Sequence, residues 1–61
     1  MGPNHRFLCL VIDRTTKATL REYPEIVAEN WCNARWQAAN RYVEEIGSLH
    51  GDWYVDSLEL D

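Results

Sequence analysis

The chain has few of the residues that fix a small protein covalently or through a metal. Among its 61 residues there are two cysteines, Cys9 and Cys32, too few for the disulfide framework of a small secreted domain. No Cys-x-x-Cys or His-x-x-x-His pair occurs, so the short-spaced ligand pairs of a zinc site are missing. We therefore expect no metal site, and we expect both cysteines to be reduced and to pack as small buried hydrophobes.

Long apolar segments are also missing. The longest apolar run, Phe7–Ile12, has six residues, whereas a membrane-spanning helix needs about 20. Residues 1–6 are polar, so they do not have the pattern of a secretory signal peptide. The sequence predicts a cytoplasmic protein that does not associate with membranes.

Positive charge is scarce. Six Lys and Arg residues stand against ten Asp and Glu residues, giving a net charge of −4. Direct binding of DNA or RNA requires a basic stripe that this composition does not provide, and an acidic domain suits a basic protein surface instead. The chain also has no glycine-rich phosphate loop, and no nucleophile stands in a glycine-framed turn beside a base. We expect neither an enzyme nor a cofactor.

What the chain does have is a strand that is apolar on both faces. Successive strand residues point to opposite sides, so Phe7, Cys9 and Val11 share one face of this strand. Leu8, Leu10 and Ile12 share the other. Because the chain has one helical segment to offer, one face of the sheet is expected to stay uncovered, and the sequence leaves open which set lies under the helix.

The remaining pattern predicts one domain over residues 1–61, with residues 1–5 as a loose end. We expect strands over residues 6–13 and 18–28, joined by a short polar hairpin, and a last strand over 53–60. A helix is expected over residues 31–46, with Asn30 as its N-cap and Gly47 as its C-cap. Pro24 cannot donate a ladder hydrogen bond, and a proline inside a strand indicates an edge position or a bulge. The second strand should therefore be an edge strand that is broken near this residue.

The order β-β-α-β predicts an α+β fold, a three-stranded sheet with one helix on one face. The doubly apolar first strand is best placed in the middle, which gives the strand order 2-1-3. The third strand then runs antiparallel to the first and parallel to the second, so the sheet is mixed in direction but antiparallel between neighbours.

The best candidates for a contact with a partner are aromatic and charged residues. More aromatic rings are present than one short helix can cover, and aromatic rings beside a bare apolar face are typical of an interface. Arg35 falls inside the apolar arc of the helix, either as an interface anchor or with its stem reaching towards Glu22, Glu25 or Asp56. The acids Asp52, Asp56, Glu59 and Asp61 either imitate phosphates for a basic groove or keep the chain soluble. The predicted partner-binding residues are Tyr23, Trp36, Trp53, Tyr54, Arg35, Asp52 and Asp56.

Over nearly its whole length the chain resembles small β-β-α-β proteins with which bacteriophages disable host machinery. The segments that carry the resemblance are the helix entry Ile26-Val27-Ala28-Glu29-Asn30, the helix alanines Ala34, Ala38 and Ala39, and the strand opening Gly51-Asp52-Trp53-Tyr54-Val55. The group includes an inhibitor of bacterial RNA polymerase and some anti-CRISPR proteins. The resemblance concerns order and size, and it implies an inhibitor that covers a surface on a host protein complex.

Two functions are therefore expected from the sequence. The first is a non-enzymatic protein-binding module, an inhibitor of a host complex. The alternative is a homo-oligomer, such as a homodimer, with a structural or regulatory role, in which the bare sheet faces of two copies pack together.

Overall fold

The computed structural model of the protein describes residues 4–48 and 50–60. It contains strand β1 (His5–Asp13), strand β2 (Thr19–Ala28), helix α1 (Trp31–Ile46) and strand β3 (Trp53–Glu59). Each expected element is present with ends that differ by at most one residue. His5, expected in the loose end, already belongs to β1, while residues 1–3 and Asp61 of the expected acidic tail lie outside the described residues.

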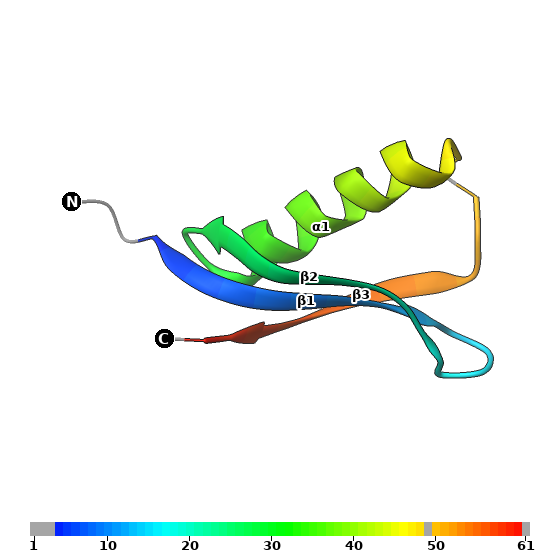
Figure 1. Cartoon of the computed structure of the whole chain (residues 1–61), viewed down its shortest axis with the longest axis horizontal. Helices are drawn as coiled ribbons and strands as arrows, with labels where there is room; N and C mark the ends of the chain where they lie inside the picture. The colour runs from blue at the N-terminus through cyan, green and yellow to red at the C-terminus, as the bar shows by residue number, and fades with distance from the viewer. Residues whose placement is uncertain (1–3, 49, 61) are drawn as a thin grey trace.

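The three strands form one sheet in the order β2-β1-β3, as expected. β1 pairs antiparallel with both neighbours, so β2 and β3 run in the same direction. Helix α1 lies along one side of this sheet, and no other helix or strand of the described chain covers the opposite side (Figure 1). The fold is therefore α+β, with a covered face, an open face and two edges.

Both ends of α1 are closed by the residues expected to cap it. The Asn30 side-chain oxygen accepts a hydrogen bond of 2.8 Å from the backbone N–H of Asn33. At the other end Gly47 adopts φ = 71° and donates its N–H to the carbonyl of Val43 at 2.8 Å. Glycine takes this left-handed conformation without the steric cost that a Cβ brings. The helix therefore begins and ends where local chemistry favours it.

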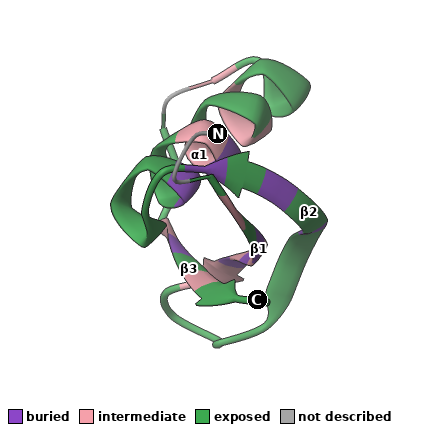
Figure 2. Cartoon of the chain, turned by 90° about the vertical axis from the view of Figure 1, so that its left-hand side faces the viewer, coloured by how far each residue is buried: buried purple, intermediate pink, exposed green. Residues whose placement is uncertain are grey.

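The structure decides which face of β1 lies under the helix. Phe7, Cys9 and Val11 point towards α1 and are buried. Leu8, Leu10 and Ile12 point to the open face and are half-buried. Buried and half-buried residues accordingly alternate along β1, and Figure 2 shows buried purple bands separated by exposed green ones along β2.

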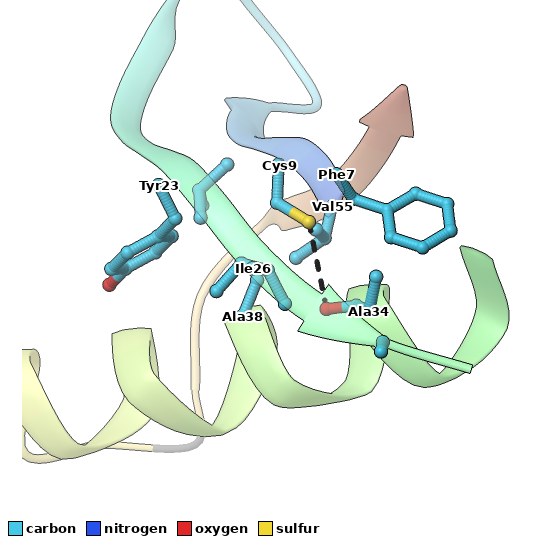
Figure 3. Packing of buried hydrophobic residues seen from close by; sticks show 9 residues of the cluster. Phe7, Cys9, Tyr23, Ile26, Ala34, Ala38 and Val55 are labelled. Carbon is cyan, nitrogen blue, oxygen red and sulfur yellow. Dashed lines mark hydrogen bonds between the residues drawn. The ribbon is translucent and has the colours of Figure 1, made fainter. Parts of the chain in front are cut away.

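Small residues allow α1 to lie close to the sheet. Ala34 and Ala38 are fully buried against the strands, and the Cys9 thiol donates a weak hydrogen bond of 3.6 Å to the carbonyl of Ala34 (Figure 3). β2 and β3 complete this core. Its buried members are Phe7, Cys9, Val11, Tyr23, Ile26, Ala28, Ala34, Ala38 and Val55.

Strand β2 is continuous, but its pairing with β1 is irregular. The register shifts once between Phe7 and Cys9 of β1, opposite Pro24 and Glu25, and again between Val11 and Ile12. The expected edge position of β2 is confirmed. The expected break near Pro24 is wrong, because the strand continues through this residue with a register irregularity. The first irregularity changes the alternation, so Tyr23 and Ile26 both face the helix although they are three residues apart.

Candidate functional site

The four aromatic residues expected at one contact surface lie in different places. Tyr23 is 4% exposed and lies in the core under α1, so its placement beside the bare face is wrong. The guanidinium of Arg21 lies 4.8 Å from the centre of its ring. Burial, and after it the Glu45 carboxylate, raises the pKa of the Tyr23 phenol. Tyr23 is thus a packing residue.

Trp53 also faces the helix side of the sheet. Its ring meets that of Tyr42 in α1 edge to face, with centroids 5.0 Å apart, a geometry that aromatic pairs favour. The ring stands directly over Gly51, whose φ is 148°, and a Cβ there would come within 2.5 Å of the indole. Gly51 and Trp53 therefore fix how the chain enters β3.

Tyr54 is half-buried and Trp36 is exposed, and they belong to different elements. Tyr54 lies on the open face, opposite Ile12, and its ring has the charged groups of Arg14 and Lys17 each 5.5 Å from its centroid. Trp36 lies on α1 and is 66% exposed. The structure thus separates Tyr23, which is buried in the core, from the half-buried Trp53 and Tyr54 and the exposed Trp36.

The charged candidates are also separated. Arg35 lies on α1 with its guanidinium 5.3 Å from the centre of the Trp31 ring, rather than reaching Glu22, Glu25 or Asp56. Asp52 is held at the hairpin, where it pairs with Arg14 at 3.2 Å. It also accepts a hydrogen bond of 2.8 Å from the Thr15 hydroxyl. Asp56 lies on the open face beside Leu10.

We define the open face as the side of the sheet turned away from α1. Its central row is Leu8, Leu10 and Ile12 of β1, and the register with β3 places Leu58, Asp56 and Tyr54 beside these three residues. On the β2 side, Glu22 is paired with Leu10. Leu58 is 64% exposed, a large apolar side chain with no role in the core.

The charges of the open face are arranged in bands. Leu8 and Leu58 lie towards one end, next to the ion pair of Arg6 with Glu25 at 3.3 Å. Arg14, itself paired with Asp52, and Lys17 lie at the other end, around Tyr54. Between them Asp56 and Glu22 lie on either side of Leu10. An apolar centre with charged groups at its margin is the usual anatomy of a protein–protein contact.

A second surface lies along the outer edge of β3, where a groove of about 390 Å³ opens between this strand and α1. We call it the edge groove. Helix α1 contributes Cys32, Arg35 and Trp36 to its lining, β3 contributes Trp53, Tyr54 and Val55, and Arg14 lies at one end. The edge groove brings together four of the seven predicted partner-binding residues: Arg35, Trp36, Trp53 and Tyr54.

Sequence reasoning missed Arg14 as a surface residue and placed Cys32 wrongly. Cys32 was expected to be buried, but it is exposed, because the sheet contacts a narrow stripe of α1 centred on Ala34 and Ala38. The stripe of small residues was the available signal, since Cys32 lies beside it rather than in it. The even spacing of Leu58 with Tyr54 already places both residues on one face of the last strand, and the structure puts that face on the open side.

The described residues offer little for other kinds of site. Within residues 4–48 and 50–60, no group of three or more His, Cys, Asp or Glu side chains is placed to hold a metal ion. The helix of the described chain is neither long nor apolar enough to cross a membrane.

Comparisons with protein families, with curated proteins and with solved structures find no match for this chain. The class that fold and surface define is a small α+β domain with one helix-covered sheet face, an open apolar face and a grooved edge.

Proposed function

We propose that the protein is a small non-enzymatic binding module that uses the open face to cover a surface of another protein. The observation that carries this proposal is the central row of Leu8, Leu10 and Ile12, extended by Leu58, on the side of the sheet without a helix. A contiguous apolar surface on a small domain is characteristic of a protein contact.

The partner is expected to present an apolar patch with basic groups beside it. Asp56 and Glu22 flank Leu10 at the middle of the open face, and the whole chain has a net charge of −4. Opposite charges on two surfaces speed their encounter and fix their relative orientation. A basic protein surface, such as one that handles nucleic acid, meets these requirements.

Within this class, we propose an inhibitor of a bacterial host complex as the biological role. The support is the resemblance in element order and size to phage proteins that disable host machinery, together with an accessible face and a compact single domain. Such an inhibitor acts by occupying a surface, which needs shape and charge rather than catalytic groups.

The test is a substitution in the open face that does not touch the core. Leu58→Lys places a positive charge in the apolar region and opposes a basic partner. We expect the variant to keep the circular dichroism spectrum and melting temperature of the wild type, and to lose the partner that wild-type protein captures from bacterial lysate. Ile46→Lys is the matched control, since Ile46 is exposed on α1, on the other side of the sheet.

Two results would overturn the proposal. One is equal capture of the same partner by wild type, Leu58→Lys and Ile46→Lys. The other is a purified wild type that self-associates and is converted to a monomer by Leu58→Lys alone. That second result would favour the homo-oligomer in which the open faces of two copies pack together.

A further inference from the structure

The two edges of the sheet are built differently. β2 carries Pro24 and two register irregularities, and prolines and bulges are the features with which proteins prevent a sheet edge from pairing further. β3 has no proline, and its register with β1 is unbroken from Phe7↔Glu59 to Asp13↔Trp53. The β3 edge is therefore regular enough to accept another strand.

The hydrogen bonds to β1 show which groups of β3 face outwards. At the two ends of the ladder, the Leu60 N–H donates to the Arg6 carbonyl and the Arg14 N–H donates to the Asp52 carbonyl, at 2.8 and 2.9 Å. Hydrogen-bonded positions alternate along an antiparallel ladder. The even-numbered residues of β3 therefore turn their backbone N–H and C=O groups towards β1. Odd-numbered residues, among them Val55, turn their N–H and C=O to the outer edge.

We propose that the occupant of this edge is a second copy of the chain. Two β3 strands would pair antiparallel across a two-fold axis at Val55, joining two sheets into one of six strands. This assembly uses the edge groove and leaves the central row of the open face uncovered, so it goes beyond the proposed function. In this register Val55 faces Val55 of the second copy and can exchange both N–H···O=C bonds with it. Trp53 faces Ser57 of the second copy; the Trp53 carbonyl already accepts a hydrogen bond of 3.2 Å from Arg14 Nη2, so in the dimer this oxygen must accept a second hydrogen bond.

Charge complementarity selects this register among the neighbouring ones. With the axis at Val55, Tyr54 lies opposite Asp56 of the second copy, and Arg14 and Lys17 lie beside that Tyr54 ring. An axis at Asp56 would set two Asp56 carboxylates against each other. An axis at Tyr54 would bring together the basic groups of both copies. Like charges directly opposite each other destabilise a strand pair.

The edge groove has the size and lining that this assembly requires. α1 packs over all three strands, so the two helices would lie over the two copies of β1, three strand spacings or about 14 Å apart. Helices in direct contact are about 8–10 Å apart. Large side chains must therefore fill the space between the two helices. Two such side chains, Trp36 and Arg35, line the groove between α1 and β3, and Trp36 is 66% exposed.

The test measures self-association of the purified protein by sedimentation velocity over a concentration series. Asp56→Lys sets a positive charge against Arg14 and Lys17 at two symmetric places, so the dimer dissociation constant should rise at least about tenfold. The double variant Asp56→Lys/Lys17→Glu restores opposite charges and should recover dimerisation. Glu44→Lys, which makes the same charge change on an exposed position of α1, should dimerise like the wild type.

Alkylation of Cys32 supplies a second measurement that reports on the edge groove itself. Because Cys32 lines this groove, its labelling rate should fall as the wild-type concentration rises, and should stay constant for Asp56→Lys. A wild type that sediments as a monomer at every concentration overturns the proposal, as does equal weakening by Asp56→Lys and Glu44→Lys. A wild type that dimerises but loses its dimer with Leu58→Lys also overturns it, because the contact is then the open face.

Discussion

Single residues of the same type have opposite environments in this domain, and the two cysteines are the clearest case. Cys9 is fully buried and its thiol donates to the carbonyl of Ala34. Burial, and after it the Asp56 carboxylate, raises the pKa of the Cys9 thiol. Cys32 is exposed on α1. The thiolate is the reactive form of cysteine, so the burial of Cys9 and its raised pKa both lower the rate at which this thiol reacts.

We therefore predict two widely separated rates of alkylation in dilute native protein near neutral pH. One thiol should react at the rate of an exposed cysteine, and the second should react only as fast as the domain opens. Cys32→Ser should remove the fast phase, and Cys9→Ser should remove the slow one. A single fast phase accounting for both thiols would show that Cys9 is accessible.

Individual site residues were harder to predict than elements. Tyr23 was assigned to the contact surface because one short helix cannot cover all the aromatic rings. Plain alternation along β2 would not place it with Ile26 under the helix, and only the irregularity opposite Pro24 and Glu25 does so. A sequence shows that a proline favours a bulge, but it does not show at which residue the side chains change from one face of the sheet to the other. Arg35 and Trp36, by contrast, were found from their unusual place on the helix, and both line the edge groove.

At the scale of elements, the hairpin between β1 and β2 is organised by Asp13. One oxygen of its carboxylate accepts the backbone N–H groups of Thr15 at 2.8 Å and Thr16 at 2.9 Å. These two backbone donors, that of Thr16 first, lower the pKa of Asp13 below its usual value. The next turn residue, Lys17, has φ = 66°, a left-handed conformation that closes the turn.

A lowered pKa in the folded state has a defined consequence for stability. The ionised Asp13 stabilises the fold above the unfolded-state pKa of about 4, and this contribution is lost as the pH falls through the lower, folded-state pKa. Asp13→Asn keeps an oxygen acceptor but does not titrate. We predict that wild type is more stable than Asp13→Asn near neutral pH and that the difference disappears in acid.

Urea unfolding of both proteins over a pH series measures this difference. Glu44→Gln serves as the control for loss of one carboxylate away from the hairpin. A stability difference between wild type and Asp13→Asn that stays constant down to strong acid would show that the two backbone donors do not act on the ionised carboxylate.

The elements themselves could be predicted almost completely. Asn30 and Gly47 mark the ends of α1 through their side-chain acceptor and positive φ, which are local properties. The strand order followed from the two-sided run Phe7–Ile12, which is stable only in the middle of the sheet. The face of β1 under the helix could not be predicted, since Phe7 and Leu8 are both apolar and a shift by one residue exchanges them.

At the scale of the whole molecule, the core lies on one side of the sheet. Ile26 and Val27 are neighbours in β2, yet Ile26 is 1% exposed under α1 and Val27 is 53% exposed. A domain of this length has a stability of only a few kcal/mol, roughly 0.05–0.15 kcal/mol per residue. Removal of a methyl group should therefore cause a measurable loss of unfolding free energy on the helix side of the sheet and almost none on the open face.

We predict that Ile26→Val lowers the free energy of unfolding by about 0.5–1.5 kcal/mol, the usual cost of removing one buried methylene. Val27→Ala, which removes more atoms one residue away, should change it by less than about 0.5 kcal/mol, as for most surface substitutions. Urea unfolding in dilute solution gives both values. A larger loss for Val27→Ala than for Ile26→Val would mean that the open face is part of the core.

The irregular pairing of β2 also sets how far association can proceed. A sheet with two equally regular edges can add copies without end, as in a fibril. Here one edge is closed by Pro24 and the register shifts beside it, so once two β3 strands have met, both remaining edges of the assembly belong to β2. Growth is then self-limiting, and polymerisation is prevented by the same residues that bend β2 over the core.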